Sequence, residues 1–103
     1  MPVYLLWEWE NPKEEERNKM RYKLGDEVRR YREKKLKEGV RWEVLALTDN
    51  TRRSVVLYTF ETMEDFDKIW NDEEWQRAES QWSYYVDNCT VRILRPSIRV
   101  PPV

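Results

Sequence analysis

The sequence predicts one α+β domain whose elements follow the order βαββαβ, with a four-stranded antiparallel sheet and both helices on one face. Four short runs rich in β-branched and aromatic residues are separated by two longer segments with helical spacing and helix caps. The chain has 103 residues, enough for one continuous core. Because crossover connections are right-handed, this order brings both helices to the same face. We expect the domain to cover residues 1–96 and an extended, proline-containing tail to cover 97–103.

The first strand is predicted at residues 3–9, where the alternating side chains are largely apolar on both faces. A helix over residues 12–38 follows, with Asn11 as its cap and Pro12 at its first position. A straight helix of that length would run about 40 Å, well past a strand of roughly 23 Å. We therefore expect a kink at Gly25 or an overhang.

The next two strands are joined by a polar turn and form a hairpin, residues 41–48 and 53–60. A second helical segment covers residues 63–85. Thr62 is its cap, and Asp72 restarts it, so the segment is predicted as one broken helix or two short ones. A last strand is predicted at residues 90–95 and ends at Pro96.

With both helices on one face, the other face of the sheet stays bare, although it also carries apolar side chains. An exposed apolar patch of this kind usually marks an interface, and a second copy related by a two-fold axis can cover it. We therefore expect a homodimer formed face to face between two sheets. The residues predicted for this dimer face are Tyr4, Leu6, Glu8, Glu43, Leu45, Leu47, Arg92 and Leu94.

Aromatic residues are unusually abundant, with six Trp and six Tyr in the chain. Rings that converge between sheet and helices can line a cleft for a flat ligand. They can also simply fill a core, because large rings pack efficiently and an indole N–H needs only one partner. Core packing is the plainer explanation, and a ligand cleft is the alternative that carries a function. The candidates for the wall of such a pocket are Trp7, Trp9, Trp42, Tyr58, Trp70 and Trp82.

Composition narrows the classes of function. The 19 basic and 20 acidic residues balance, so no overall field attracts nucleic acid or an anionic membrane. No basic leader opens the chain and no apolar run approaches the roughly 18 residues that span a bilayer, so we expect a cytoplasmic protein. A single cysteine and no histidine argue against a disulfide framework and a zinc site, and we expect no metal and no cofactor. Abundant Glu, Lys and Arg resemble the composition of heat-adapted proteins.

No pattern in the sequence identifies a catalytic residue. A Ser or Cys nucleophile has no histidine partner here, and two glycines do not make a phosphate loop. Cys89 is either a nucleophile or a small core residue, and its place at the start of an apolar strand favours the core. Glu8, Glu43 and Arg92 share one predicted sheet face, where Glu8 and Arg92 form either a catalytic group or, more simply, a structural ion pair.

An acidic turn with aromatic residues on both sides interrupts the second helical segment at residues 66–76 (Phe-Asp-Lys-Ile-Trp-Asn-Asp-Glu-Glu-Trp-Gln), and the last strand ends in Arg95–Pro96. With the element order over residues 3–96, these features resemble the dimeric α+β barrel superfamily, which includes antibiotic-biosynthesis monooxygenase-like and NIPSNAP-like small proteins. The resemblance implies a ferredoxin-like fold and a homodimer, but a fold does not choose among activities. The RNA-recognition module shares the element order, yet residues 53–57 lack its stacking aromatics.

Two functional hypotheses follow. In the first, a homodimeric protein binds an apolar or aromatic small molecule in an aromatic-lined pocket, or oxidises it without a cofactor. In the second, the same dimer is a non-catalytic assembly or regulatory module. A sizeable cavity among the aromatic side chains favours the first hypothesis, and a filled core favours the second.

Overall fold

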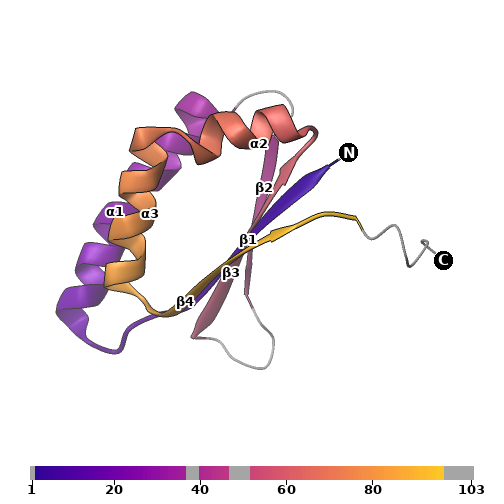
Figure 1. Cartoon of the computed structure of the whole chain (residues 1–103). Coiled ribbons are helices and arrows are strands. Elements are labelled where there is room, and N and C mark those ends of the chain that lie inside the picture. Colours follow the sequence, from indigo (N-terminus) through magenta and orange to yellow (C-terminus); the bar gives the residue numbers. More distant parts are fainter. Residues whose placement is uncertain (1, 37–39, 47–51, 97–103) are drawn as a thin grey trace.

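The computed structural model describes residues 2–36, 40–46 and 52–96, which form a four-stranded antiparallel sheet with helices over one face (Figure 1). The strands lie side by side in the order β2-β3-β1-β4. This is the predicted ferredoxin-like arrangement, and the α+β fold class is confirmed. The predicted tail, residues 97–103, and Leu47 lie outside the described residues. The elements are β1 Val3–Glu10, α1 Glu15–Lys35, β2 Val40–Ala46, β3 Arg53–Phe60, α2 Met63–Trp70, α3 Glu73–Tyr85 and β4 Asp87–Leu94.

Strand β1 is central and fixes the two faces of the sheet. Trp7 lies opposite Val56 of β3 and opposite Val91 of β4. Because side chains alternate along a strand, every second residue of β1 enters the core and the others face outward. The inward residues Val3, Leu5, Trp7 and Trp9 are buried, and the outward ones are half-buried.

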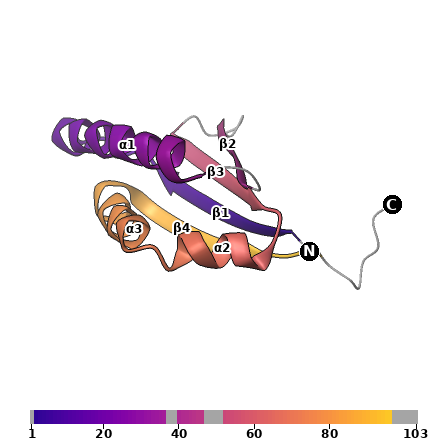
Figure 2. The same cartoon turned by 90° about the horizontal axis from the view of Figure 1, so that it is seen from above.

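The core fills the space between the inward side of β1 and β3 and the helices. Figure 2 shows α1 and α3 running beside each other on the same side of the sheet. At the α2 end, aromatic rings close the core. Phe60 of β3 packs edge to face on Phe66, with their ring centroids 5.5 Å apart, and Phe66 stacks on Trp70 with a centroid distance of 5.4 Å. These contacts fix α2 against the sheet.

Helix α1 begins at Glu15, three residues later than predicted. The predicted cap, Asn11, makes a different contact, because its Oδ1 accepts a hydrogen bond from Nε1 of Trp9 at 3.0 Å. Its side chain therefore holds the end of β1 instead of the helix start. Glu14 occupies the cap position and makes no capping hydrogen bond with its side chain.

Helix α1 runs without a break through Gly25, so the predicted kink is wrong. Its 21 residues span only about 32 Å, which removes most of the expected overhang. A Cβ atom added at Gly25 would lie 3.9 Å from Cζ3 of Trp82 on α3, an ordinary van der Waals contact, so this position has room for an alanine.

Helices α2 and α3 meet at Asp72, where the predicted restart is confirmed. Oδ1 of Asp72 caps α3 by accepting from the Glu74 amide at 2.8 Å, and Oδ2 accepts from the Tyr31 hydroxyl at 3.0 Å. Lys35 of α1 lies 3.7 Å from Oδ2. Burial raises the pKa of Asp72, but these donors and the Lys35 charge outweigh burial, so the pKa lies below its usual value. Thr62 caps α2, also as predicted.

Replacing Asp72 tests this junction. Asp72→Ala should lower the free energy of unfolding by about 1–2 kcal/mol, because it removes a helix cap and leaves the Tyr31 hydroxyl without its acceptor. Urea denaturation at neutral pH measures the loss. Asp72→Asn keeps one oxygen that can accept from the Glu74 amide, so it should lose clearly less. Equal losses for the two variants would contradict the capping role.

Candidate functional site

A cavity of about 250 Å³ lies between the inward face of the sheet and helices α1 and α3. Its wall is mainly aromatic and aliphatic with a few polar groups, the composition typical of small-molecule sites. The strands contribute Trp7, Trp9, Val44, Ser54, Val56 and Tyr58. The helices contribute Arg21, Gly25, Val28, Tyr31, Arg32, Trp75, Ala78, Glu79 and Trp82.

The cavity opens to solvent beside β2. Val44 is 62% exposed, and every other lining residue is buried or half-buried. Trp42 lies on the same face of β2, opposite Tyr58, and its ring centroid is 5.7 Å from Cζ of Arg32. Trp42 and Val44 therefore flank the opening, and the Arg32 guanidinium lies next to it.

Edge-to-face ring contacts build the aromatic wall. The ring centroid of Trp75 on α3 lies 6.3 Å from that of Trp7 and 5.3 Å from that of Tyr58, with interplanar angles of 85° and 83°. Further along the sheet, Trp9 meets Trp82 at 5.1 Å and 85°. Perpendicular rings bring the positive edge of one indole to the negative face of the next, which holds each ring in a defined orientation.

Several polar atoms of the wall have no partner. Nε1 of Trp7, Trp75 and Trp82 and Nε of Arg32 are buried and make no hydrogen bond within the part of the chain that the structure describes. Buried donors are normally paired, so each of these needs an explanation.

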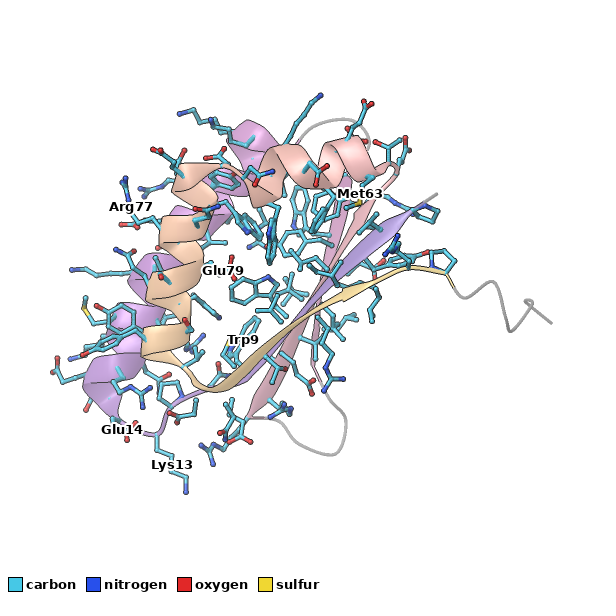
Figure 3. All side chains as sticks on the ribbon, in the orientation of Figure 1. Trp9, Lys13, Glu14, Met63, Arg77 and Glu79 are labelled. Carbon is cyan, nitrogen blue, oxygen red and sulfur yellow. The ribbon has the colours of Figure 1, made fainter. Side chains whose placement is uncertain are left out.

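Glu79 is the acid of this wall, and Figure 3 shows it on α3 above Trp9, between the helix and the sheet. Burial raises the pKa of Glu79; the Trp75 indole, which approaches it without completing a hydrogen bond, opposes the shift. Burial also raises the pKa of Tyr58, against the opposing charge of Arg32. In both groups burial therefore disfavours the charged form.

Four of the six residues proposed for the pocket from sequence line this cavity: Trp7, Trp9, Tyr58 and Trp82. Trp70 does not, because it lies in the last turn of α2, where it stacks on Phe66. Trp42 lies outside the wall, at the opening. Their role in binding a ligand stays a prediction.

Sequence reasoning missed Trp75, Arg32 and Glu79 as pocket residues. A signal was present, because the lining residues of each helix recur at three- and four-residue spacing and so share one helix face. On α1 these are Arg21, Gly25, Val28, Tyr31 and Arg32, and on α3 they are Trp75, Ala78, Glu79 and Trp82. A charged residue inside such a stripe is the feature to look for.

The outward face of the sheet carries the residues proposed for the dimer interface. The strand register places Tyr4, Leu6, Glu8, Glu43, Leu45, Arg92 and Leu94 on this one face, as the alternation predicts. Val55 and Leu57 of β3 lie among them and were missed. Leu45 and Leu94 are 46% and 43% exposed, so the face presents apolar surface to solvent.

The predicted ion pair between Glu8 and Arg92 is wrong. Oε1 of Glu8 accepts a hydrogen bond from Nε of Arg53 at 2.6 Å, and Nη1 of Arg53 also contacts Glu10 at 3.2 Å. The β1–β3 register causes this, since it sets Arg53 directly opposite Glu10 and diagonal to Glu8. The hydrogen bond from Arg53, with a smaller effect of the Arg92 charge, lowers the pKa of Glu8.

Cys89 is half-buried and packs against the core. Burial, with a smaller effect of Glu79, raises the pKa of its thiol to about 11, so the thiol is protonated at neutral pH and a poor nucleophile. Among the described residues, no group of three or more His, Cys, Asp or Glu side chains is placed to hold a metal ion. No helix in the described ranges has the length and apolar character needed to cross a membrane.

No known family and no curated protein matches this sequence, but solved structures share its fold. SnoaB, a cofactor-independent oxygenase from Streptomyces nogalater, matches with a TM-score of 0.69 and 8% identity over 98% of both chains. A dimeric ferredoxin-like protein of unknown function from Jannaschia matches with a TM-score of 0.70 and 15% identity, over 93% of this chain and 100% of the other. A candidate antibiotic biosynthesis monooxygenase from Deinococcus radiodurans matches with a TM-score of 0.68 and 9% identity over 98% of both chains.

These likenesses confirm the suspected resemblance to the monooxygenase-like superfamily at the level of the fold. Identities of 8–15% establish a shared chain path and nothing about a shared reaction. The activity must therefore be argued from the cavity and the outward sheet face.

Glu79→Gln tests the electrostatics of the cavity. Because the pKa of Glu79 is raised in the fold, the native state holds the proton more tightly than the unfolded chain does. Its contribution to stability therefore falls as the pH rises above 4.5, the ordinary pKa of a glutamate side chain. Glu79→Gln should be more stable than the native sequence at neutral pH, and this gain should vanish at low pH.

Urea denaturation at a series of pH values measures the difference, with the exposed Glu33→Gln on α1 as the control. A gain from Glu79→Gln that stays constant from acid to neutral pH would contradict the raised pKa.

Proposed function

We propose that the protein binds a small apolar or aromatic molecule in the cavity between the sheet and helices α1 and α3. The observation that carries the proposal is the space itself. Protein cores rarely leave voids larger than a water molecule, yet about 250 Å³ lies open here among aromatic rings. Rigid rings on the strands and on α3 offer flat surfaces on which a planar ligand can stack.

We propose further that the working form is a homodimer held by the outward sheet face. The apolar surface of that face and the dimeric Jannaschia neighbour support this. Oxygenation without a cofactor, the activity of the Streptomyces nogalater neighbour, is the reaction to assay first on any ligand that binds. The assembly-module alternative accounts for the outward face but gives the cavity no role.

Filling the cavity should abolish ligand binding. Ala78 lines the cavity from α3, whereas Arg77, its neighbour, points away from the sheet in Figure 3. We expect saturable quenching of tryptophan fluorescence by at least one class among quinones, phenols, haem and fatty acids. Ala78→Leu should weaken that binding by at least about tenfold, because leucine occupies the space. Arg77→Leu adds the same side chain to the outside of the helix and should leave it unchanged.

An unchanged affinity in Ala78→Leu, or quenching that never saturates for any class, would contradict binding in this cavity.

A charge on the outward face should break the dimer. Leu6 lies at the middle of that face on the central strand. Leu6→Arg would bury an unpaired charge between the sheets, so we expect the dimer dissociation constant to rise by about a hundredfold or more. Sedimentation equilibrium measures it, with Tyr84→Arg, which is 75% exposed on α3, as the control. A native chain that sediments as a monomer, or a Leu6→Arg dimer of native affinity, would contradict the interface.

A further inference from the structure

The unpaired polar groups of the cavity are all hydrogen-bond donors. Nε1 of Trp7, Trp75 and Trp82 and Nε of Arg32 are buried without a partner in the described residues. Unpaired buried donors destabilise a fold, and native structures keep few of them. Because these four atoms have almost no accessible surface, a ligand in the cavity does not reach them, and its polar part must meet the charged groups that line the cavity.

Charge on the wall favours an acidic ligand. Arg21 and Arg32 both line the cavity from α1, and neither forms an ion pair with a described carboxylate. Nε of Arg21 donates to Oδ1 of Asn18 at 3.1 Å. Glu79 is the one acid among the described residues of the wall, and burial raises its pKa. Two guanidinium groups therefore line the cavity against one carboxyl group.

Arg32 is held where a ligand enters. Its Cζ lies 5.7 Å from the Trp42 ring, and Trp42 flanks the opening beside β2. Deeper in the cavity, the Arg32 charge acts on the Tyr58 hydroxyl. A guanidinium between these two rings keeps its N–H groups in a fixed orientation, which suits a planar carboxylate.

The volume limits the size of the ligand. A cavity of about 150 Å³ is enough for benzene. The 250 Å³ found here leaves room for roughly one more ring or a polar substituent. A compound of one or two fused rings with a short acidic group fits these dimensions.

We infer that the cavity binds the anion of a small aromatic acid, with the carboxylate on Arg32 and the ring between the indoles of Trp7, Trp75 and Trp82. This assignment rests on the proposed function of the cavity and names its ligand class. The ring faces take the apolar part of the ligand.

Calorimetric titration with 1-naphthoate and 1-naphthamide tests the inference. The two probes share one ring system and differ in charge. Naphthoate should bind at least about tenfold more tightly, because a hydrogen bond to a charged group is stronger than one to a neutral group. Arg32→Met keeps the length of the side chain and removes its charge, so it should erase that preference while leaving naphthamide affinity unchanged. Arg29→Met, on an exposed position of α1, should behave as the native chain does.

Equal affinities for the two probes, or a naphthoate preference that survives in Arg32→Met, would overturn the inference and leave the proposed cavity function standing. Failure of both probes to bind would overturn the inference. If no member of the wider fluorescence panel binds either, the proposed function fails with it. If Arg32→Met does not fold, the preference of the native chain between the two probes still decides.

Discussion

The edge-to-face contacts between β1 and α3 hold the two layers of this protein apart. Trp7 and Trp9, on successive inward positions of β1, meet Trp75 and Trp82 at 6.3 and 5.1 Å, each at 85°. Indole rings are rigid, so two such contacts set the separation of sheet and helix. On the walls between them lie residues with little or no side chain, among them Gly25 and Ala78. The cavity follows from large rigid rings beside residues too small to fill the space.

Polar contacts at both ends of α1 keep this space from collapsing. Near its start, Arg17 donates to Oδ1 of Asp87 at 2.9 Å and to the carbonyl oxygen of Val86 at 3.2 Å, where α3 passes into β4. Near its end, Tyr31 donates to Asp72 at the start of α3. Because α1 is tied to both ends of α3, it cannot move toward the sheet without breaking one of these contacts. The cavity is therefore pre-formed, which lowers the ordering cost of binding.

The sequence predicted what local periodicity and capping control, and it failed where distant side chains decide. Alternation along residues 3–9 and the restart at Asp72 depend on nearby residues, and both are confirmed. The Asn11 cap failed because Trp9 uses the same oxygen. The Gly25 kink failed because α1 continues unbroken through this residue. The Arg53 partner of Glu8 required the strand register, which composition does not contain. In the sequence, a charged cavity residue such as Arg32 looks the same as a residue on a solvent-exposed helix face, because the sequence does not show that the sheet packs opposite it.

A crystal structure of the unliganded protein at a resolution that shows ordered water is the most direct test of the central claim, that rings and small residues leave a built-in cavity. We expect Trp75 edge-on to Trp7, open space beside Ala78, and solvent density between the sheet and the helices. An α1 packed directly on β3, with no solvent between the layers, would contradict the claim.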